Sequence, residues 1–423
     1  MEMSDYNILA VESESGVTRR GFLKGALASG VGVAAMASFS PEVMARALLA
    51  GKTAADITGA GTKPGVVDLD QNENPLGPSP LAVEAVKAHI GQLNRYMNDF
   101  PIEMFIKLNM MVGVSFEGLN LQNPTRNDMM EAQKRNRIGL APGSGELLRG
   151  ITLAALENGG HVLEAEGGYG DVSRYAETLQ RRGRNVTITR TPLTTDKKHD
   201  LKAMQKAVTA DTKLVVITNP NNPTGTLVSH EEIGWFVDNV PSTVRIVIDE
   251  AYIDFVKDPT YKTAAIFAIN KPNVVVTRTF SKIFGLAGLR LGFGIGAPDY
   301  FDTLELYVGF PQNVLTAFGA AAALNDTAHV QKSKETVWAG RDYLSTELKK
   351  MGVTYTPSES NFMLIDVSKD PQGIAKYLRS KNVMVRVPDM WGFKNHIRVS
   401  IGTQDELEVF INTFKEAMAN AGT

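Results

Sequence analysis

The chain has 423 residues, enough to bury a large core and to form two domains, or one large and one small domain. Its 44 basic and 46 acidic residues leave a net charge of -2, so composition gives no electrostatic sign of a nucleic-acid partner. Cysteine is absent, which excludes disulfides, thiolate nucleophiles and cysteine zinc sites. The six histidines show no metal-ligand spacing, so no metal site is expected.

Residues 1–47 are predicted to be an export signal rather than part of the fold. Arg19-Arg20, followed by Phe22-Leu23-Lys24, precedes an apolar run of small residues from Ala26 to Phe39. This pattern resembles the twin-arginine signal of bacteria, whose export machinery passes folded cargo. Ala35-Met36-Ala37 and Ala45-Arg46-Ala47 are candidate cleavage sites. We therefore expect a periplasmic or otherwise exported protein.

Residues 214–296 alternate short β-branched runs with helical stretches, which is typical of buried parallel strands joined by helices. Strands are predicted at 213–218, 245–249 and 273–277. A further run at 290–296 follows too closely for a crossover helix. It is therefore predicted to be antiparallel to its neighbour.

Three polar residues follow these strands at crossover spacing. Asn222 lies in a turn cluster after the first strand, Asp249 follows it by 27 positions, and Lys282 follows Asp249 by 33. Each separation fits one βαβ unit, so all three are expected at the carboxyl edge of the sheet, where ligands bind. A lysine after a strand is usually solvated, but a desolvated lysine at such an edge suits Schiff-base chemistry.

The C-terminal part is predicted to form a small domain. A helical region from 314 to 350 leads to strands at 362–367, 383–387 and 396–401. Thr403-Gln404-Asp405-Glu406 is a capping box for a closing helix, whose predicted buried stripe is Leu407, Ile411, Phe414 and Met418. The predicted division is 1–47 for the signal, 48–94 for an N-terminal segment of the small domain, 95–320 for the large domain and 321–423 for the small domain.

From Asp68 to the end, the chain resembles fold-type I pyridoxal-phosphate enzymes, most closely the histidinol-phosphate aminotransferase branch. Besides the three spaced residues, the matching motifs are Asn72-Glu73-Asn74-Pro75-Leu76-Gly77-Pro78-Ser79-Pro80, Asn94-Arg95-Tyr96, Gly143-Ser144-Gly145-Glu146, Asp249-Glu250-Ala251-Tyr252, Thr279-Phe280-Ser281-Lys282 and Ile397-Arg398-Val399-Ser400-Ile401-Gly402-Thr403. The resemblance implies an α/β fold: a large domain with a mostly parallel seven-stranded sheet sandwiched by helices, and a smaller α+β domain. It also implies a transaminase that uses pyridoxal 5′-phosphate, loaded before export. Such an enzyme exchanges an amino group between an amino acid or amine and a 2-oxo acid such as 2-oxoglutarate.

The resemblance assigns roles around the cofactor ring. Lys282 would hold the cofactor aldehyde and move a proton, and Asp249 would keep the pyridine nitrogen protonated. Asn222 and Tyr252 would donate hydrogen bonds to the phenolate oxygen. Tyr169 would stack on the ring face.

A second set of residues is expected to hold the cofactor phosphate. Ser144 and Gly145 open a predicted helix, whose free N–H groups and dipole favour an anion. Thr279, Ser281 and Arg290 add hydroxyls and a guanidinium.

Further roles concern the neighbouring subunit and the substrate. Tyr96 matches a tyrosine that reaches the phosphate of the partner subunit, which implies a homodimer with shared sites. Arg398 matches the arginine that grips the substrate's anionic group, and Arg386 matches a second one that this branch uses for its phosphorylated substrate. Asn74 is assigned to the substrate as well. Guanidinium groups bind carboxylate and phosphate alike, so these residues leave that choice open.

The chain departs from the family in two places near the expected substrate mouth. Between Tyr96 and Gly143 it is about twenty residues longer than usual, and this insert contains Met97, Met104, Met110, Met111, Met129 and Met130. The methionines suit either a lid over a bulky apolar substrate or, more simply, the packing of an extra helix. Gly167-Gly168 replaces a common Pro-Thr pair, which predicts a looser loop around Tyr169.

Three other functions stay open at this stage. The same scaffold serves decarboxylases, racemases and lyases, among them threonine-phosphate decarboxylase. Gly292, Gly294 and Gly296 suggest a nicotinamide-dependent oxidoreductase, but their spacing is wrong and they lie within a strand. A non-catalytic binding module is the last alternative. Histidinol phosphate is disfavoured as the substrate, because an exported enzyme would not meet a cytoplasmic intermediate.

Overall fold

The computed structural model describes residues 52–57, 64–97, 101–121, 123–311, 313–368 and 370–420. The predicted export signal at 1–47 lies outside these residues. Within the described ranges, no helix is both long enough and apolar enough to cross a membrane.

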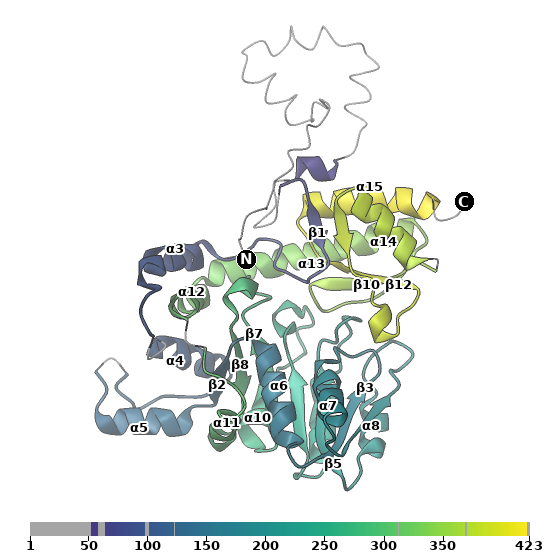
Figure 1. The fold of residues 1–423 in the computed structure, drawn as a ribbon. Coiled ribbons are helices and arrows are strands. Elements are labelled where there is room, and N and C mark those ends of the chain that lie inside the picture. Colours follow the sequence, from purple (N-terminus) through teal and green to yellow (C-terminus); the bar gives the residue numbers. More distant parts are fainter. Residues whose placement is uncertain are drawn as a thin grey trace, which may run out of the picture.

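A seven-stranded sheet forms the centre of the large domain (Figure 1). Its strands run in the order β2 (Ile138–Ala141), β8 (Gly292–Ile295), β7 (Val274–Thr279), β6 (Arg245–Asp249), β5 (Thr212–Thr218), β3 (Gly160–Ala165) and β4 (Val186–Thr191). The pairs from β7 to β4 are parallel, whereas β8 is antiparallel to both β7 and β2. The predicted antiparallel strand after Lys282 is thereby confirmed.

Helices cover both faces of this sheet because its strands are apolar on both sides. Along β5, Val215 and Ile217 pack into one hydrophobic core, while Leu214 and Val216 pack into another. The first core also contains side chains of α8 (Leu201–Ala207), α9 (His230–Asp238) and α10 (Ala265–Asn270). The second contains side chains of α6 (Ser144–Ala155), α7 (Asp171–Arg181) and α11 (Pro298–Leu304). This confirms the predicted sandwich.

Two helices connect the large domain to the small one. The predicted helical region is divided into α12 (Val314–Asn325) and α13 (Thr327–Lys350). The division falls at Asp326, whose side chain accepts a hydrogen bond from the N–H of His329 and so caps α13. On the other side, α3 (Pro80–His89) packs against α12, with the His89 and Phe318 rings stacked 3.6 Å apart.

The small domain contains two short sheets. β12 (His396–Ser400), β10 (Phe362–Asp366) and β9 (Thr354–Thr356) are antiparallel, while β1 (Val67–Leu69) pairs in parallel with β11 (Val383–Val385). The N-terminal segment therefore contributes a strand here. α14 (Pro371–Ser380) and α15 (Gln404–Asn420) cover these sheets. The predicted capping box begins α15: the Thr403 N–H donates to Glu406 Oε2 at 2.7 Å.

The methionine-rich insert forms α4 (Ile102–Met111) and α5 (Arg126–Arg135), beside the edge strand β2 in Figure 1. Met104 is buried, whereas Met110, Met111, Met129 and Met130 are exposed. Phe105 and Met130 line a cavity of about 750 Å³ against α11, which shares no residue with a second cavity at the carboxyl edge of the central sheet. The insert therefore packs as extra helices away from that cavity.

Candidate active site

A cavity of about 850 Å³ opens at the carboxyl edge of the central sheet. Asn222 follows β5, Asp249 ends β6 and Lys282 follows β7, so the predicted convergence of these three residues is observed. Nine other predicted residues line the same cavity: Ser144, Gly145, Tyr169, Tyr252, Thr279, Ser281, Arg290, Arg386 and Arg398.

Lys282 lies half-buried in a tight turn after β7. Its Nζ donates a hydrogen bond to the Gln71 carbonyl oxygen at 3.0 Å and lies 5.7 Å from the centre of the Tyr252 ring. Burial lowers the pKa of Lys282 to about 8, and the positive charge of Arg398 adds to the effect. The turn requires Gly285, since φ is +66° and a Cβ there would lie 2.3 Å from the Gly77 carbonyl oxygen.

Asp249 is the buried acid of the cavity. Its Oδ1 accepts a hydrogen bond from the Thr277 hydroxyl at 2.8 Å, and only 4% of the residue is exposed. Burial raises the pKa of Asp249 to about 6, although the hydrogen bond from Thr277 opposes this shift. A positively charged ring nitrogen in the cavity would relieve the cost of this buried charge.

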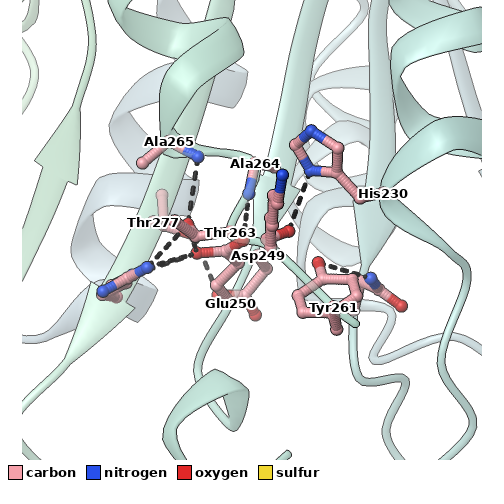
Figure 2. A network of polar contacts seen from close by, with 11 residues as sticks. His230, Asp249, Glu250, Tyr261, Thr263, Ala264, Ala265 and Thr277 are labelled. Atoms are coloured by element: carbon pink, nitrogen blue, oxygen red, sulfur yellow. Dashed lines mark hydrogen bonds and ion pairs between the residues drawn. The ribbon is translucent and has the colours of Figure 1, made fainter. Parts of the chain in front are cut away.

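A buried ion pair lies beside Asp249 (Figure 2). Glu250 Oε2 accepts hydrogen bonds from Nε and Nη2 of Arg278 at 3.0 and 2.8 Å. Thr263 and Ala264 donate to the same carboxylate, each at 2.7 Å. Because Glu250 follows β6 and Arg278 lies near the end of β7, this pair holds together the two strand ends that carry the catalytic candidates.

Two separate hydrogen bonds order the cavity wall on the small-domain side. Asn222 Oδ1 accepts from Arg398 Nη1 at 2.7 Å, which leaves the Asn222 amide to donate elsewhere. The Asn72 amide donates to the Tyr252 hydroxyl oxygen at 3.1 Å. That hydroxyl can therefore donate its own proton into the cavity. Burial raises the pKa of Tyr252, so the hydroxyl stays protonated.

Arg398 is positioned to bind an anion. Its Nη2 donates to the Asp70 carbonyl oxygen at 2.6 Å, and within the described ranges its buried Nε has no partner. The rings of Phe362 and Trp391 each lie 5.4 Å from the guanidinium carbon. Arg386 lines the same wall, with Nη2 3.9 Å from Asp70 Oδ2.

The other end of the cavity fits a phosphate group. Ser144 and Gly145 begin α6, and the preceding Gly143 provides no side-chain cap, so the helix N–H groups face the cavity uncovered. Gly143 has φ +97°, and a Cβ there would lie 2.5 Å from Arg290 Nη2. The Thr279 hydroxyl donates to Ser281 Oγ at 2.9 Å. With Asp249 and Lys282 at the opposite end, these residues fit pyridoxal 5′-phosphate.

Two predicted site residues lie outside this cavity. Asn74 is buried, and its amide donates to the Ile283 carbonyl oxygen at 2.7 Å and to Ser333 Oγ at 3.0 Å. It therefore supports the Lys282 turn instead of lining the cavity, which corrects its assignment to the substrate. Tyr96 is 93% exposed and does not line the cavity of its own chain.

The loop before α7 also differs from expectation. Gly167 has φ +63°, and a Cβ there would lie 2.8 Å from the Phe393 ring. The glycine therefore permits close packing of the loop against the small domain. Trp391 reinforces this packing, because its Nε1 donates to the Tyr169 carbonyl oxygen at 3.0 Å.

Several lining residues were missed by sequence reasoning. These are Asp171, Trp391 and Gln71, and Asp70 contacts the lining residue Arg398 through its main-chain oxygen. Asp171 and Trp391 have no motif that distinguishes them, and Asp70 and Gln71 precede the Asn72 motif without being part of it. The position of Asp70 and Gln71 directly before the Asn72 motif was the one sequence feature that could have indicated a role for them in the site. Their roles depend on main-chain oxygens, which no residue type reveals.

Comparison with known proteins agrees with this geometry. Residues 64–414 match the family described as aminotransferase class I and II. The chain belongs to this family. It is a pyridoxal-phosphate-dependent aminotransferase, as predicted.

Individual relatives agree with the family assignment. The chain is 34% identical to the histidinol-phosphate aminotransferase of Moorella thermoacetica over 84% of this chain and 86% of that one. It is also 34% identical to histidinol-phosphate aminotransferase 1 of Cupriavidus pinatubonensis, over 84% and 89% of the two chains. The fold matches the histidinol-phosphate aminotransferase of Sinorhizobium meliloti, solved with pyridoxal-5′-phosphate, at a TM-score of 0.73 and 24% identity over 84% and 91%.

Proposed function

We propose that this aminotransferase performs its exchange in the cavity between Lys282 and Arg398. The observation that carries the proposal is that a lysine with a lowered pKa and a buried carboxylate face one cavity, with anion-binding groups at both ends. Pyridoxal phosphate, when bound, withdraws electrons and stabilises negative charge on the substrate Cα. The protein's task is then to hold the reactants and to move protons.

Each residue has a distinct part in this task. With the cofactor bound, Lys282 would hold its aldehyde through Nζ and would also move a proton to and from the substrate Cα. Asp249 holds a proton on the ring nitrogen by its negative charge. Asn222 and Tyr252 would donate hydrogen bonds to the ring oxygen, and Tyr169 would cover one ring face. Arg398 binds the anionic group of the substrate.

The phosphate end of the cofactor would be held by groups that are already in position in the structure. The amides of Ser144 and Gly145 point from the α6 N-terminus, and Arg290 adds a guanidinium. Thr279 and Ser281 supply hydroxyl groups from the loop that also carries Lys282. The cofactor position is therefore coupled to the position of the lysine.

Half-reactions followed at the cofactor absorbance test the proposal. Addition of an amino donor converts the loaded enzyme to the pyridoxamine form, and a 2-oxo acid such as 2-oxoglutarate restores it. Lys282→Ala is expected to abolish this cycle. Release of carbon dioxide without a need for a 2-oxo acid would instead favour the decarboxylase alternative.

We further propose a homodimer with shared sites. Supporting this, Tyr96 is almost fully exposed on its own chain and lies outside its own cavity. Sedimentation measures the number of subunits in the assembly. Mixing inactive Tyr96→Ala and Lys282→Ala subunits restores part of the activity if each site uses residues of both chains; no recovery in a mixed dimer contradicts sharing.

Export is the remaining part of the proposal, supported by Arg19-Arg20 and the apolar run after it. The cofactor would be loaded in the cytoplasm before the folded enzyme reaches the twin-arginine machinery. Replacing both arginines by lysine is expected to retain the enzyme in the cytoplasm of a bacterial host. An unchanged periplasmic fraction would contradict this route.

A further inference from the structure

Asn72 lines the catalytic cavity from the segment between β1 and α3, and only 1% of the residue is exposed. Its φ of +56° lies in the left-handed region, which asparagine enters more readily than most residues but at a cost in free energy. The Asn361 amide donates hydrogen bonds to the main-chain oxygens of Asn72 and Glu73 at 2.9 and 3.1 Å. The surrounding structure therefore holds Asn72 in an uncommon conformation at the cavity wall.

Ser400 determines which end of the Asn72 amide faces the large domain. The main-chain N–H of Asn72 donates to Ser400 Oγ at 2.8 Å, and the Ser400 hydroxyl donates in turn to Asn72 Oδ1 at 3.1 Å. If the amide were turned over, its NH2 group would face Ser400, and the Ser400 proton would lose this acceptor. The oxygen of the Asn72 side chain is therefore held on strand β12 of the small domain.

The NH2 group of Asn72 donates to the Tyr252 hydroxyl oxygen at 3.1 Å, and both residues are buried. An amide NH2 group donates and does not accept, so the Tyr252 hydroxyl accepts this hydrogen bond and keeps its own proton for another acceptor. Tyr252 lines the same cavity, where that acceptor would be the ring oxygen of the cofactor. The direction of the Tyr252 hydrogen bond is therefore set from the small domain, through Ser400 and Asn72.

We propose that Asn72 is a positioning residue that fixes the Tyr252 hydroxyl as a hydrogen-bond donor to the cofactor ring oxygen. Ser400 contributes by orienting the Asn72 amide, so the small domain takes part in holding a cofactor whose other contacts come mainly from the large domain. Asn72 acts through Tyr252, and no contact of its own with the cofactor is required. This inference rests on the proposed function, because the ring oxygen belongs to the cofactor assigned there.

Ligand affinities of the cofactor-free enzyme test the inference without any turnover. Asn72→Asp has almost the same shape and also tolerates a positive φ, but its carboxylate accepts the Tyr252 proton instead of donating one. Fluorescence titration compares two ligands, pyridoxal 5′-phosphate and an analogue that lacks the ring oxygen. The ratio of the two affinities is expected to fall about tenfold in Asn72→Asp, because only the first ligand has the oxygen to which Tyr252 donates.

Tyr252→Phe provides the matched background for this comparison. It removes the hydroxyl through which Asn72 acts, so adding Asn72→Asp to Tyr252→Phe is expected to leave the affinity ratio unchanged. An effect of Asn72→Asp that persists in this background would come from its charge alone and overturns the inference.

Ser400→Ala is a second variant, which introduces no charge and leaves Asn72 in place. The Asn72 amide is then free to turn over, and the affinity ratio is expected to fall by a smaller factor of about three. An unchanged ratio in both Asn72→Asp and Ser400→Ala overturns the inference. The half-reactions test the proposed function separately, because these affinities involve no amino donor.

Discussion

At the residue scale, burial brings the pKa values of the two titrating groups of the site closer together. The pKa of Asp249 rises to about 6 and that of Lys282 falls to about 8, because each charge loses contact with water. Both groups therefore titrate within about a unit of neutral pH. Groups with pKa values near the working pH are suited to giving and accepting protons.

The lowered pKa of Lys282 predicts the pH dependence of cofactor loading. Only the neutral amine attacks the cofactor aldehyde, so the loading rate of the cofactor-free enzyme is expected to rise with pH and to level off above about pH 8. Stopped-flow absorbance measures this rate. A rate that climbs steadily towards pH 10.5, the ordinary value for lysine, would show that burial has not shifted the group.

The raised pKa of Asp249 predicts that its buried charge lowers the stability of the protein although the charge is needed for function. Its folded pKa is about 6, above the ordinary 3.8, so the cost of its buried charge is present above pH 6 and disappears as the pH falls towards 3.8. Asp249→Asn is therefore expected to stabilise the cofactor-free protein by about 3 kcal/mol at pH 7.5. The same change should lower activity about 100-fold or more.

Urea unfolding at two pH values checks the stability part of this prediction. The stabilisation by Asp249→Asn is expected to vanish near pH 4, where both proteins are neutral at this position. Equal stability of the two proteins at pH 7.5 would contradict the prediction. Activity is measured separately on the cofactor-loaded enzymes.

At the element scale, Asp249 lies at the end of β6 and Lys282 follows β7. The Glu250–Arg278 pair joins the ends of these two strands (Figure 2). Nearly all of both side chains is buried. Removing one member of the pair leaves the charge of the other buried without an opposite charge beside it. Arg278→Met is therefore expected to destabilise the protein by about 3–5 kcal/mol.

The double variant Glu250→Gln with Arg278→Met separates charge from shape. It removes both charges and is expected to recover much of the stability that Arg278→Met loses. Urea midpoints measure the stability, and the absorbance of the bound cofactor reports whether the strand ends keep their positions. No recovery in the double variant would mean that geometry, and not the buried charge, causes the loss.

At the scale of the whole molecule, the site is assembled from both domains. Lys282 and Asp249 come from the large domain, Arg386 and Arg398 from the small one, and the segment around β1 lies between them. That segment pairs with β11 and provides the main-chain oxygens of Asp70 and Gln71 to Arg398 and Lys282. It therefore connects the two halves of the active site.

Truncation tests this connecting role. A chain that begins at residue 52 keeps β1 and is expected to retain activity, whereas a chain that begins at 72 loses β1 and both main-chain oxygens. The shorter chain is expected to lose the small-domain pairing and its activity. Circular dichroism and cofactor absorbance compare the two. Full activity in the shorter chain would contradict the role given to β1.

The architecture and the position of the cofactor site could both be predicted from sequence patterns. Buried parallel strands leave continuous apolar runs, and crossover lengths bring Asn222, Asp249 and Lys282 to one edge, so local pattern and spacing were sufficient. Resemblance to the family added Tyr169, Tyr252 and the phosphate-binding residues, all of which line the cavity.

Contacts between residues far apart in the sequence became known from the folded structure alone. Asn74 turned out to support the Lys282 turn, and the methionine-rich insert packed away from the cavity. Asp70 contacts Arg398 through its main-chain oxygen and Arg386 through its carboxylate. Both arginines lie more than 300 positions away in the sequence. Such contacts depend on how two domains meet, and no periodicity or spacing within one segment encodes that meeting.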